Sequence, residues 1–574
     1  MPPIEVIAPP PSEDKISEFV KIFNLHPIAA GTLIRRGYKT LDDAKRFLFP
    51  RLRDINDPSL LKDINEGAEL FAESVIANRQ IVIYGDYDVD GITSTAIIAN
   101  FCRIVGRAAV AYLPHRITDG YGISADAVKT LAEKYSGALL VAVDCGSTAA
   151  EEVALARKLG FDVIVIDHHT VKETAPPANA HINPRRDDCA YPFKELAACG
   201  LTLLFVTAVR GRLKEKGYFK RREAPNLKQF LDIVALGTVA DVVPLVSDNR
   251  IFVSEGIRQF ARTQSPGLDA LMHFAGCARN SITTYELGFK LSPRINAAGR
   301  IGNAEVALEL LLCDSTQKAF ELASKLNEFN ERRRAEEQTI FDLASAKIKK
   351  KLSENPALKA AVIYDNEWHT GVIGIVASRL AEEYSMPVII VGRSEQGWRG
   401  SARTIGNVDV YSILDSRREL MTEFGGHRKA AGFSIKEGSV AEFEREVEAA
   451  ADKLIDARAL ETLIEVDGEL SLSSIDYHLC SSLDRLAPFG LENPQPLFYL
   501  SDAEVVRKNI TRDGRHLQLE LTNGRATFDA IAFNHSDKID GVDKATLVGL
   551  PRIENYLGDE RIKIVIKHIK TASK

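Results

Sequence analysis

The sequence predicts an α/β protein whose first globular domain is a doubly wound parallel sheet. Between residues 79 and 167, apolar runs typical of buried strands occur at Ile81–Tyr84, Ala109–Leu113, Leu139–Val143 and Val163–Ile166. Segments with helical periodicity lie between them, at Thr93–Val105, Ser124–Lys134 and Ala149–Leu159. Strands that alternate with helices through short loops run parallel, because each helix carries the chain back across a face of the sheet.

Helical segments flank this sheet on both sides. Residues 1–60 place apolar residues at helical spacing, so we expect an N-terminal helical segment before a catalytic domain of residues 61–305. Residues 306–355 are rich in charges of both signs at i, i+4 spacing. This pattern is typical of a solvated helix, and we expect it to act as a spacer between two domains.

Two further domains are expected after this connecting helix. Residues 356–458 predict a second, smaller α/β domain with three glycine-rich clusters. Residues 459–574 contain short alternating strands, which favour a small β-barrel of the OB-fold type that binds single-stranded nucleic acid. The expected strands are Glu465–Leu470, Phe498–Arg507, His516–Leu521, Ala526–Phe533, Thr546–Leu550 and Arg561–Ile569.

The composition indicates a multidomain protein of the reducing cytosol. The chain has 574 residues, too many for one hydrophobic core, and its 45% hydrophobic and 26% charged residues are ordinary for globular proteins. Its 7 cysteines form no CxxC pair, which argues against disulfides and structural zinc. We find no membrane-spanning run and no secretion signal. The formal net charge of -6 means that nucleic-acid binding would depend on local basic patches.

The loop after the first strand carries the strongest chemical signal. In Gly85-Asp-Tyr-Asp-Val-Asp-Gly91, the carboxylates of Asp86, Asp88 and Asp90 occupy alternate positions. In such sheets ligands bind at the carboxyl ends of the strands. Crowded carboxylates raise one another's pKa values unless cations neutralise them, and oxygen ligands suit Mg²⁺ or Mn²⁺. The alternative interpretation is an acidic surface turn.

Other strand ends add ligand-type residues to the same edge of the sheet. The third strand leads to Asp144, the fourth leads to Asp167-His168-His169, and a later helical segment delivers Asp241. The residues expected to converge are Asp88, Asp90, Asp144, His168 and Asp241. Such a cluster suits two divalent cations about 3.5–4 Å apart that promote in-line phosphoryl displacement, and its histidine favours Mn²⁺ over Mg²⁺. The set predicts phosphoester hydrolysis.

Basic residues near this edge are candidates for substrate binding. Arg116 and Tyr121 follow the second strand, where we expect them to hold a phosphate and to stack on a base; the alternative is that they brace the loop. Arg294 and Arg300 flank small residues that permit close approach of a backbone. We therefore expect both arginines to contact the substrate.

Glycine-rich clusters of the second α/β domain are a further candidate site. Ser401 and Arg403 lie in one cluster, and Gly425, Gly426 and His427 lie in another. Glycines beside cationic side chains form backbone nests that bind phosphate. The alternative interpretation is that these are the turns of a small sheet.

The motifs around the acidic residues, taken in order, resemble those of the DHH phosphoesterase superfamily. The matching segments are Asp88-x-Asp90, Asp144-Cys-Gly, Asp167-His168-His169 and Ala240-Asp241. The resemblance implies that the five converging residues are metal ligands, that Asp144 bridges the two ions, and that His169 contacts the scissile phosphate or protonates the leaving group. One position departs from the superfamily pattern: Tyr84 stands where many members have a histidine. The first metal site then lacks a nitrogen ligand, and Asp86 is an extra carboxylate that compensates for it in catalysis or braces the loop.

The domain order resembles one branch of that superfamily over nearly the whole chain. A DHH domain, a long helix, a DHHA1-type domain and an OB-like barrel are the parts of the bacterial single-strand-specific 5′→3′ exodeoxyribonucleases. The resemblance implies a cytoplasmic enzyme of DNA recombination and repair that releases 5′-mononucleotides with two Mn²⁺ or Mg²⁺ ions. It also implies that Arg116, Arg294, Ser401 and Arg403 hold the 5′ end of single-stranded DNA. Single-strand-binding protein and a RecQ-type helicase are the partners that it implies.

Three alternatives differ in what they require of the chain. A nanoRNase that cleaves short oligonucleotides needs only the first two domains, so the barrel argues against it. An inactive DHH scaffold protein would have lost metal ligands, whereas here only the Tyr84 position departs. An inorganic pyrophosphatase is disfavoured because so small a substrate needs neither stacking rings nor a third domain.

Overall fold

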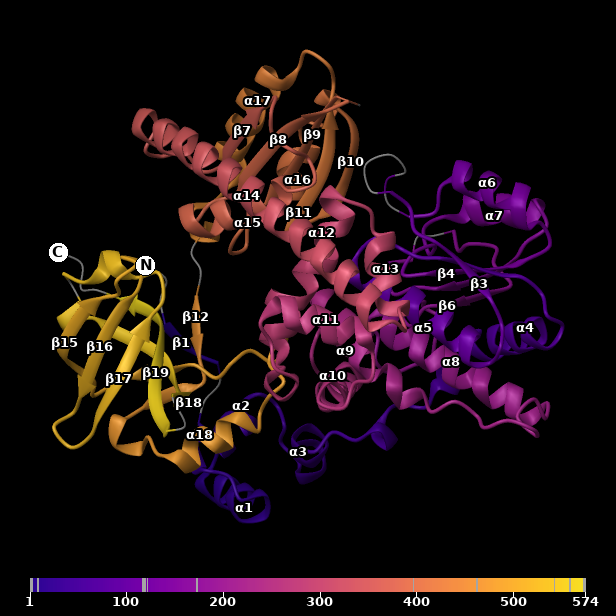
Figure 1. The fold of residues 1–574 in the computed structure, drawn as a ribbon. Helices are drawn as coiled ribbons and strands as arrows, with labels where there is room; N and C mark the ends of the chain where they lie inside the picture. Colours follow the sequence, from indigo (N-terminus) through magenta and orange to yellow (C-terminus); the bar gives the residue numbers. More distant parts are fainter. Residues whose placement is uncertain are drawn as a thin grey trace.

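The computed structural model describes residues 4–7, 10–115, 120, 122–171, 174–395, 397–460, 463–540, 542–556 and 559–570. Within these residues the chain forms a parallel sheet with helices, a second α/β domain and a C-terminal β-rich domain (Figure 1). The expected fold class is confirmed. Among the described residues, no helix combines the length and the apolar composition that crossing a membrane requires.

The first domain is built on a five-stranded sheet in which every strand is parallel. Its strands are β2 (Ile81–Tyr84), β3 (Ala109–Tyr112), β4 (Leu139–Val143), β5 (Asp162–Ile166) and β6 (Ala180–Ile182). The four expected strands are confirmed, whereas the three-residue β6 is too short for its periodicity to predict it. The spatial order β3-β2-β4-β5-β6 reverses between β2 and β4, and such a reversal is where doubly wound sheets bind ligands.

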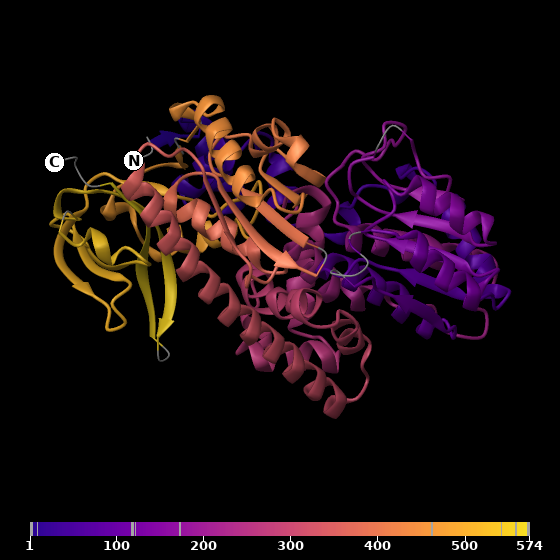
Figure 2. The same ribbon diagram turned by 90° about the horizontal axis from the view of Figure 1, so that it is seen from above.

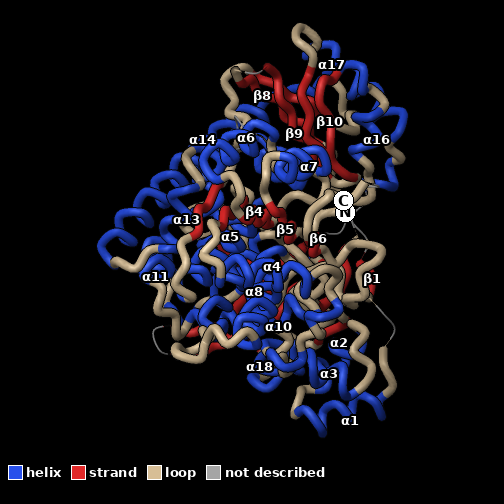
Figure 3. The backbone as a smooth tube through the Cα atoms, turned by 90° about the vertical axis from the view of Figure 1, so that its right-hand side faces the viewer, coloured by secondary structure: helices blue, strands red, loops and turns tan. Residues whose placement is uncertain are grey.

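Helices cover both faces of this sheet (Figure 3). They are α4 (Ile64–Ile76), α5 (Val89–Ile104), α6 (Ala125–Tyr135), α7 (Ala150–Lys158) and α8 (Ala198–Glu215). Ile81 and Ile83 of β2 share one core with α4, α5 and α8, whereas Val82 and Tyr84 share another with α6 and α7. Alternate residues of a strand point to opposite faces, so a strand buried on both faces must be apolar throughout.

A layer of helices follows the sheet. Its members are α9 (Leu231–Ala240), α10 (Ser247–Phe260), α11 (Pro266–Ala275), the π-helix η5 (Glu286–Leu291), α12 (Ser292–Ile301) and α13 (Glu305–Leu312). Val89 and Ile92 at the start of α5 share a buried core with these helices. The helical layer is therefore fixed to the segment that follows β2.

The single helix expected over residues 306–355 is in fact two helices. Helix α13 ends at Leu312, and Ser315 begins α14 (Thr316–Glu354) by accepting a hydrogen bond from the N–H of Lys318 (3.3 Å). Ala319 and Ala323 pack with the first domain, whereas Ile340 and Ile348 belong to a core of the second domain. The expected connecting helix is present, because α14 joins the two domains (Figure 2). It is not solvated along its whole length, because side chains near both of its ends are buried in the cores of the two domains.

The second domain is a mixed five-stranded sheet in the order β10-β11-β9-β8-β7. Its strands are β7 (Ala361–Asp365), β8 (Val388–Ser394), β9 (Gly397–Arg403), β10 (Met421–His427) and β11 (Ala430–Ile435). Its helices are α15 (Ile373–Tyr384), α16 (Val410–Asp415) and α17 (Val440–Leu454). Strands β7 and β8 are parallel and the others are antiparallel, which confirms a small α/β domain.

The third domain is a seven-stranded sheet in the order β13-β14-β18-β19-β17-β16-β15. Its strands are β13 (Gly468–Leu470), β14 (Phe498–Leu500), β15 (Glu504–Ile510), β16 (Leu517–Thr522), β17 (Thr527–Ala532), β18 (Thr546–Tyr556) and β19 (Asp559–Lys570). Two expected strands are each divided. Asp467 interrupts the first, and the preceding strand β12 (Ile464–Val466) pairs instead with β1 (Ile4–Val6). The second is interrupted between β14 and β15.

The N-terminal helices pack against this third domain. Helices α1 (Glu13–Phe23), α2 (Pro27–Arg35) and α3 (Leu41–Leu48) share one core with α18 (Tyr477–Asp484) and with the barrel strands. Arg36 binds the buried carboxylate of Asp467 through two hydrogen bonds of 2.8 and 2.9 Å. The two ends of the chain therefore form one structural unit.

A buried arginine of α10 ties that unit to the first domain. The guanidinium of Arg250 donates hydrogen bonds to the carbonyl oxygens of Phe47, Leu486, Ala487 and Pro488, at 2.9, 3.1, 2.7 and 3.2 Å. It also lies 3.6 Å from the centre of the Phe47 ring. Burial lowers the pKa of Arg250 to about 9, so it remains charged at neutral pH. One side chain thus holds the N-terminal helices, α10 and the loop after α18 together.

Replacing Arg250 with Met should loosen the contact between the third domain and the first. The carbonyl oxygens of Leu486 and Pro488 would keep Nδ2 of Asn493 as a donor, but those of Phe47 and Ala487 would lose the donor that Arg250 supplies. Each unsatisfied group costs about 1–3 kcal/mol. We expect a lower melting temperature and faster proteolytic release of the third domain. Arg258→Met on the same helix is the control, because its ion pair with Glu255 is exposed. Equal melting and proteolysis of the two variants would contradict the role given to Arg250.

Candidate metal centre

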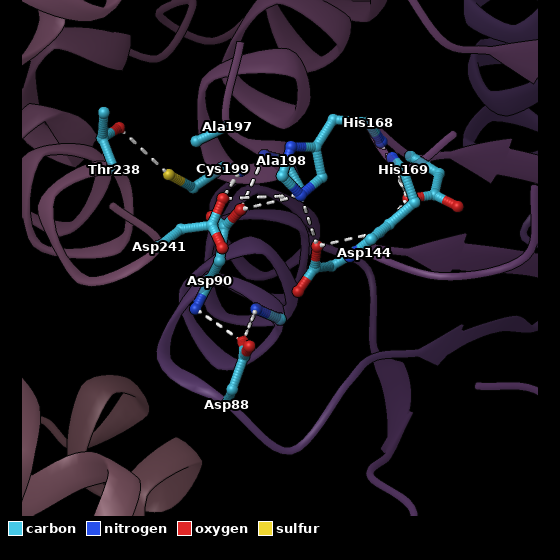
Figure 4. Close-up of polar contacts among 12 residues, drawn as sticks. Asp88, Asp90, Asp144, His168, His169, Ala197, Ala198, Cys199, Thr238 and Asp241 are labelled. Carbon is cyan, nitrogen blue, oxygen red and sulfur yellow. Dashed lines mark hydrogen bonds and ion pairs between the residues drawn. The ribbon is translucent and has the colours of Figure 1, made fainter. Parts of the chain in front are cut away.

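The acidic cluster lies where the order of the parallel sheet reverses. The loop of residues 85–88 follows β2, Asp144 follows β4, and His168 lies two residues beyond the end of β5. Asp241 ends helix α9, from the neighbouring layer. The expected convergence of these residues on one edge of the sheet is therefore present in the structure (Figure 4).

The loop after β2 is folded tightly upon itself. A Cβ atom at Gly91 would lie 2.6 Å from both the backbone nitrogen and the carbonyl oxygen of Asp86, so only glycine fits there. Asp88 begins helix α5, and its Oδ1 accepts hydrogen bonds from the N–H groups of Asp90 (2.9 Å) and Gly91 (3.1 Å). The alternating carboxylates are thus fixed by a helix cap and a glycine contact.

The ligand-type side chains form three overlapping groups. Within each group, one ligand atom per residue lies within 4.8 Å of the others. The groups are Asp86, Asp88 and Asp144; Asp90, His168 and Asp241; and Asp144, His168 and His169. Because Asp144 and His168 each belong to two groups, the residues form one cluster. Asp144 occupies a place from which one carboxylate can reach two ions.

Asp86 and Asp90 differ in the partners of their carboxylates. Both oxygens of Asp90 accept backbone hydrogen bonds at the N-terminus of α8, from Ala198 (2.7 Å) and Cys199 (2.9 Å). Asp90 therefore anchors α8 to the loop, although its Oδ2 is also 3.9 Å from Nε2 of His168. Asp86, expected only as an extra carboxylate, stands beside Asp88 and Asp144.

Burial and mutual repulsion make these carboxylates difficult to ionise without cations. Burial, reinforced by the charges of Asp88 and Asp90, raises the pKa of Asp144 well above its ordinary value. The same causes, with burial again the largest, raise the pKa of Asp241 to about 9. A divalent cation among these oxygens would remove the repulsion and favour the ionised carboxylates.

His168 has the protonation state and the surroundings of a metal ligand. Burial lowers the pKa of His168, so the imidazole is neutral. Both its ring nitrogens and Oδ1 of Asp144 are buried without a hydrogen bond among the described residues. Nε2 of His168 lies 3.3 Å from Asp144 and 3.5 Å from Asp241. This donor set of carboxylate oxygens and one imidazole fits Mn²⁺ or Mg²⁺.

Asp167 holds the second histidine of the motif. Its carboxylate is buried and accepts hydrogen bonds from the N–H groups of Ser147 (2.8 Å), His168 (2.7 Å) and His169 (3.1 Å). It also lies 2.8 Å from Nδ1 of His169. Burial opposes the charge of both groups, yet their pairing lowers the pKa of Asp167 and raises the pKa of His169 to about 9. His169 is therefore a partly exposed side chain that carries a proton.

A polar network behind this pair supports the main chain. Asn183, just after β6, donates from Nδ2 to Oγ of Ser147 (2.8 Å) and to the carbonyl oxygen of His169 (2.9 Å). Ser147 also contacts Nε2 of His181 at 2.9 Å. Neither Asn183 nor the role of Asp167 is predicted by the sequence patterns above. Asp167 could have been noticed as the first residue of the Asp-His-His run.

Tyr84 does not reach the metal cluster. Its ring is buried in the core with α6 and α7, 5.1 Å from the ring centre of Tyr112, and its hydroxyl donates to the carbonyl oxygen of Gly122 (3.1 Å). The position of the absent histidine is thus filled by a core residue.

Two of the four basic and aromatic candidates near the sheet lie on helix α12. Arg294 donates to Oδ1 of Asn327 (3.0 Å) and to the carbonyl oxygens of Lys290 (2.6 Å) and Phe274 (3.0 Å). Its guanidinium therefore braces the helical layer, and the expectation that Arg294 holds DNA stays a prediction. Arg300 lies at the domain boundary, where it donates to the carbonyl oxygen of Gly371 (2.9 Å). Arg116 and Tyr121 lie outside the described residues.

Four of the candidates in the second domain share one face of its sheet. Ser401 and Gly425 both pair with Gly432, and Arg403 and His427 both pair with Ala430. Residues paired across adjacent strands point to the same side, so these form two neighbouring rows. Gly426 lies between the rows on β10, at a left-handed φ of 151°.

The face has a cradle at the start of α15. Arg403 donates to Oγ of Ser401 at 2.8 Å. A Cβ atom at Gly374 would lie 3.0 Å from the guanidinium of Arg403 and 3.1 Å from that hydroxyl. The absence of a side chain at Gly374 leaves backbone close to one cation and one hydroxyl, which suits an anion.

Patterns of three known domains match the chain. The DHH family, N-terminal domain, matches residues 80–238; the DHHA1 domain matches residues 356–456; and the RecJ OB domain matches residues 466–568. Together they cover the parallel sheet, the second α/β domain and the seven-stranded sheet.

Curated relatives match along most of the chain. The single-stranded-DNA-specific exonuclease RecJ of Dickeya dadantii is 35% identical over 93% of this chain and 94% of its own length. The protein of the same name from Escherichia coli is 34% identical over 89% and 90%. The one from Bacillus subtilis is 30% identical over 97% of this chain and 70% of its own length.

Solved structures agree with these matches. RecJ from Thermus thermophilus in complex with Mn²⁺ has a TM-score of 0.83 at 29% identity, covering 99% of this chain and 79% of that one. The Mg²⁺ complex has a TM-score of 0.76 at 27% identity, covering 99% and 78%.

Replacing Asp144 with Asn should stabilise the protein in a chelator and weaken its stabilisation by Mn²⁺. A buried carboxyl whose pKa is raised by folding lowers stability at neutral pH, and the neutral amide removes that cost. The same change removes a charged ligand. Melting temperatures measured with EDTA and with MnCl₂ test both effects. Asp126→Asn, at an exposed site on α6, should change neither. A full Mn²⁺ response in Asp144→Asn would exclude Asp144 from the ligands.

Proposed function

The chain belongs to the RecJ family of single-stranded-DNA-specific exonucleases, and we propose that it degrades single-stranded DNA from the 5′ end and releases 5′-mononucleotides. It is a metal-dependent enzyme that uses divalent cations, Mn²⁺ or Mg²⁺. The observation that carries the proposed chemistry is the overlap of ligand groups at Asp144. Asp144 lies where the strand order of the sheet reverses, so its carboxylate could reach two ions in the ligand-binding crevice.

The ligand set proposed from the contacts differs in one residue from the set expected from the sequence. Asp86, Asp88 and Asp144 would hold one ion, and Asp144, His168 and Asp241 would hold the other. Asp90 would orient the cluster, because both of its oxygens already bind the first turn of α8. Asp86 thereby takes the ligand position expected of Asp90.

His169 is the proposed proton donor to the leaving group. When bound, two divalent cations supply an activated water and neutralise charge on the departing oxygen. Water adds to the phosphorus of the second nucleotide and loses a proton to solvent, and the bond from that phosphorus to the 3′ oxygen of the first nucleotide breaks. The proton on Nε2 of His169 passes to that 3′ oxygen, because Asp167 binds Nδ1 and keeps the ring protonated. A 5′-mononucleotide leaves, and the shortened strand again carries a 5′ phosphate.

Changing His169 to Gln should lower kcat and leave KM nearly unchanged. The glutamine cannot donate a proton of matched acidity, and loss of a general acid costs about 10²–10⁴-fold in rate. Steady-state hydrolysis of a labelled strand measures both constants. The Mn²⁺-induced rise in melting temperature should persist, which separates proton donation from ligand loss. An unchanged kcat would rule out His169 as the acid.

Ser401 and Arg403 are proposed to hold the terminal 5′ phosphate. They form the cradle at the start of α15. Gly425 and His427 lie on the same face of the sheet, in the same two rows as Ser401 and Arg403. A Cβ atom at Gly425 would meet no described atom within 4 Å, so a strand could lie along this face. Arg300, at the boundary beside Gly371, is placed to contact the strand between the two domains.

Arg403→Ala should reduce the preference for strands with a 5′ phosphate over strands with a 5′ hydroxyl. The loss of one charged hydrogen-bonding partner predicts a fall of about 10–100-fold in kcat/KM on phosphorylated strands only. Digestion of strands blocked at the 5′ or the 3′ end gives the polarity in the same assay. Arg393→Ala is the matched control, because Arg393 lies in an exposed ion pair with Glu437 in the same domain. Degradation that only a 3′ block stops would refute the proposed direction.

The proposed partners and pathway of the enzyme follow from its need for unpaired single-stranded DNA. We propose action in DNA recombination and repair in the bacterial cytoplasm, with a RecQ-type helicase supplying unwound DNA and single-strand-binding protein covering it. The nanoRNase alternative is disfavoured because the chain also matches a RecJ OB domain. An inactive scaffold is disfavoured because the carboxylates and histidines of the cluster are all present.

A further inference from the structure

Two large aromatic rings are exposed side by side on the helical layer. Tyr285 and Phe289 have 58% and 73% of their surface exposed, and their ring centres are 5.2 Å apart with an angle of 30° between the planes. Single exposed apolar residues are common on proteins, but a stacked exposed pair keeps a continuous apolar surface in water. Such a surface indicates a binding site.

The backbone beneath the rings holds them in place. They lie four residues apart around the π-helix η5, a rare element that is frequent at functional sites. Leu287 and Leu291 on its other side are buried in the core of the layer. Oγ of Ser292 donates to the carbonyl oxygen of Leu287 (2.7 Å), and a Cβ atom at Gly288 would lie 3.5 Å from Val239. The rings therefore stand on a rigid support.

The π-helix that carries the pair packs on α9, the helix that ends at the metal cluster. Val239, which the π-helix contacts, lies on the last turn of α9, and Asp241 ends that helix. The next residue, Val242, is 67% exposed with a left-handed φ of 57°. The π-helix therefore packs against the turn of α9 that leads to a proposed metal ligand.

The pair adjoins the segment leading to the barrel on the other side. Oγ1 of Thr284 donates to the carbonyl oxygen of Phe489 (2.7 Å), and the N–H of Leu245 donates to the carbonyl oxygen of Leu491 (2.9 Å). Leu491 is itself half-exposed. In Figure 1, helices α9 and α11, which flank η5, lie between the parallel sheet and the seven-stranded sheet.

We propose that Tyr285 and Phe289 form a stacking platform for the bases of single-stranded DNA between the metal centre and the barrel. The inference rests on the proposed function, because that function requires one strand to contact both sites. Every base has a π-face, so stacking suits an enzyme that must accept any sequence. Nζ of Lys290 lies 5.9 Å from the Tyr285 ring and 3.5 Å from a carboxylate oxygen of Glu286, so a cation that phosphates could share stands beside the platform. A protein partner for the same surface would be a different outcome of the test.

The test compares DNA binding by full-length variants. We expect Phe289→Ala and Tyr285→Ala each to weaken binding of a strand of about 20 nucleotides by about tenfold, within the range known for base–aromatic stacking. Phe289→Leu keeps an apolar side chain but loses the π-face, and should resemble the alanine variant. Phe289→Trp should retain affinity, and its indole fluorescence should be quenched by DNA. Phe320→Ala is the control, since Phe320 is half-exposed on α14 and its ring centre lies 4.8 Å from that of Phe274, with an angle of 50° between the planes.

The outcomes separate this inference from the proposed function. Failure of the wild type to degrade single strands with either metal would overturn the proposed function. Degradation by the wild type, together with wild-type DNA affinity of Phe289→Leu and Phe289→Trp and no fluorescence change, would overturn the platform and favour a protein partner. Melting temperatures with Mn²⁺ check folding, and if an alanine variant misfolds, the Leu and Trp variants still decide the question.

Discussion

Repulsion among buried carboxylates at the edge of the parallel sheet is the constraint on which the rest of the structure depends. Asp144 and Asp241 resist ionisation because they are buried beside other carboxylates, so the folded chain keeps a site whose charges only cations can balance. Backbone devices hold the groups there against that repulsion. Gly91 allows the loop to close on Asp86, and Asp144 is kept at a left-handed φ of 61°, a conformation that costs a non-glycine residue free energy. Metal binding would therefore stabilise the folded state.

Helix α12 connects the loop of that site to the second domain. A Cβ atom at Gly299 would lie 2.8 Å from the carbonyl oxygen of Tyr87, so this helix touches the loop that carries Asp86 and Asp88. At the next residue, Arg300 binds the carbonyl oxygen of Gly371 in the second domain. Two adjacent residues therefore link the loop of Asp86 and Asp88 to the segment just before the cradle at the start of α15. The small residues of this helix serve contact between backbones, and Arg294 braces the helix internally.

Local pattern predicted the fold class and four strands of the sheet, because apolar runs and the residues that end them are local signals. It placed Asp144, His168 and Asp241 at one edge for the same reason. It could not show that Asp90 differs from Asp86 in its hydrogen bonds. The partners of Asp90 lie at the start of α8, 108 positions further along the chain. Nor could it show that Arg294 turns inward, because its partners include Asn327, 33 residues away. Phe289 alternates with Leu287 and Leu291, which are buried, so the sequence pattern does not distinguish its exposed ring from a core residue.

The packing of the first helices against the last domain has a consequence for biosynthesis. The N–H of His26 donates to Ser482, 456 residues later, and Phe19 and Leu33 share a core with Leu479 and Phe498. Ribosomes add about 5–20 residues per second, so roughly 20–90 s separate the two partners during translation. During that interval α1 and α2 have only each other and α3 to pack against, because the rest of their core belongs to the third domain. The N-terminal helices therefore reach their native packing only after the third domain has been synthesised.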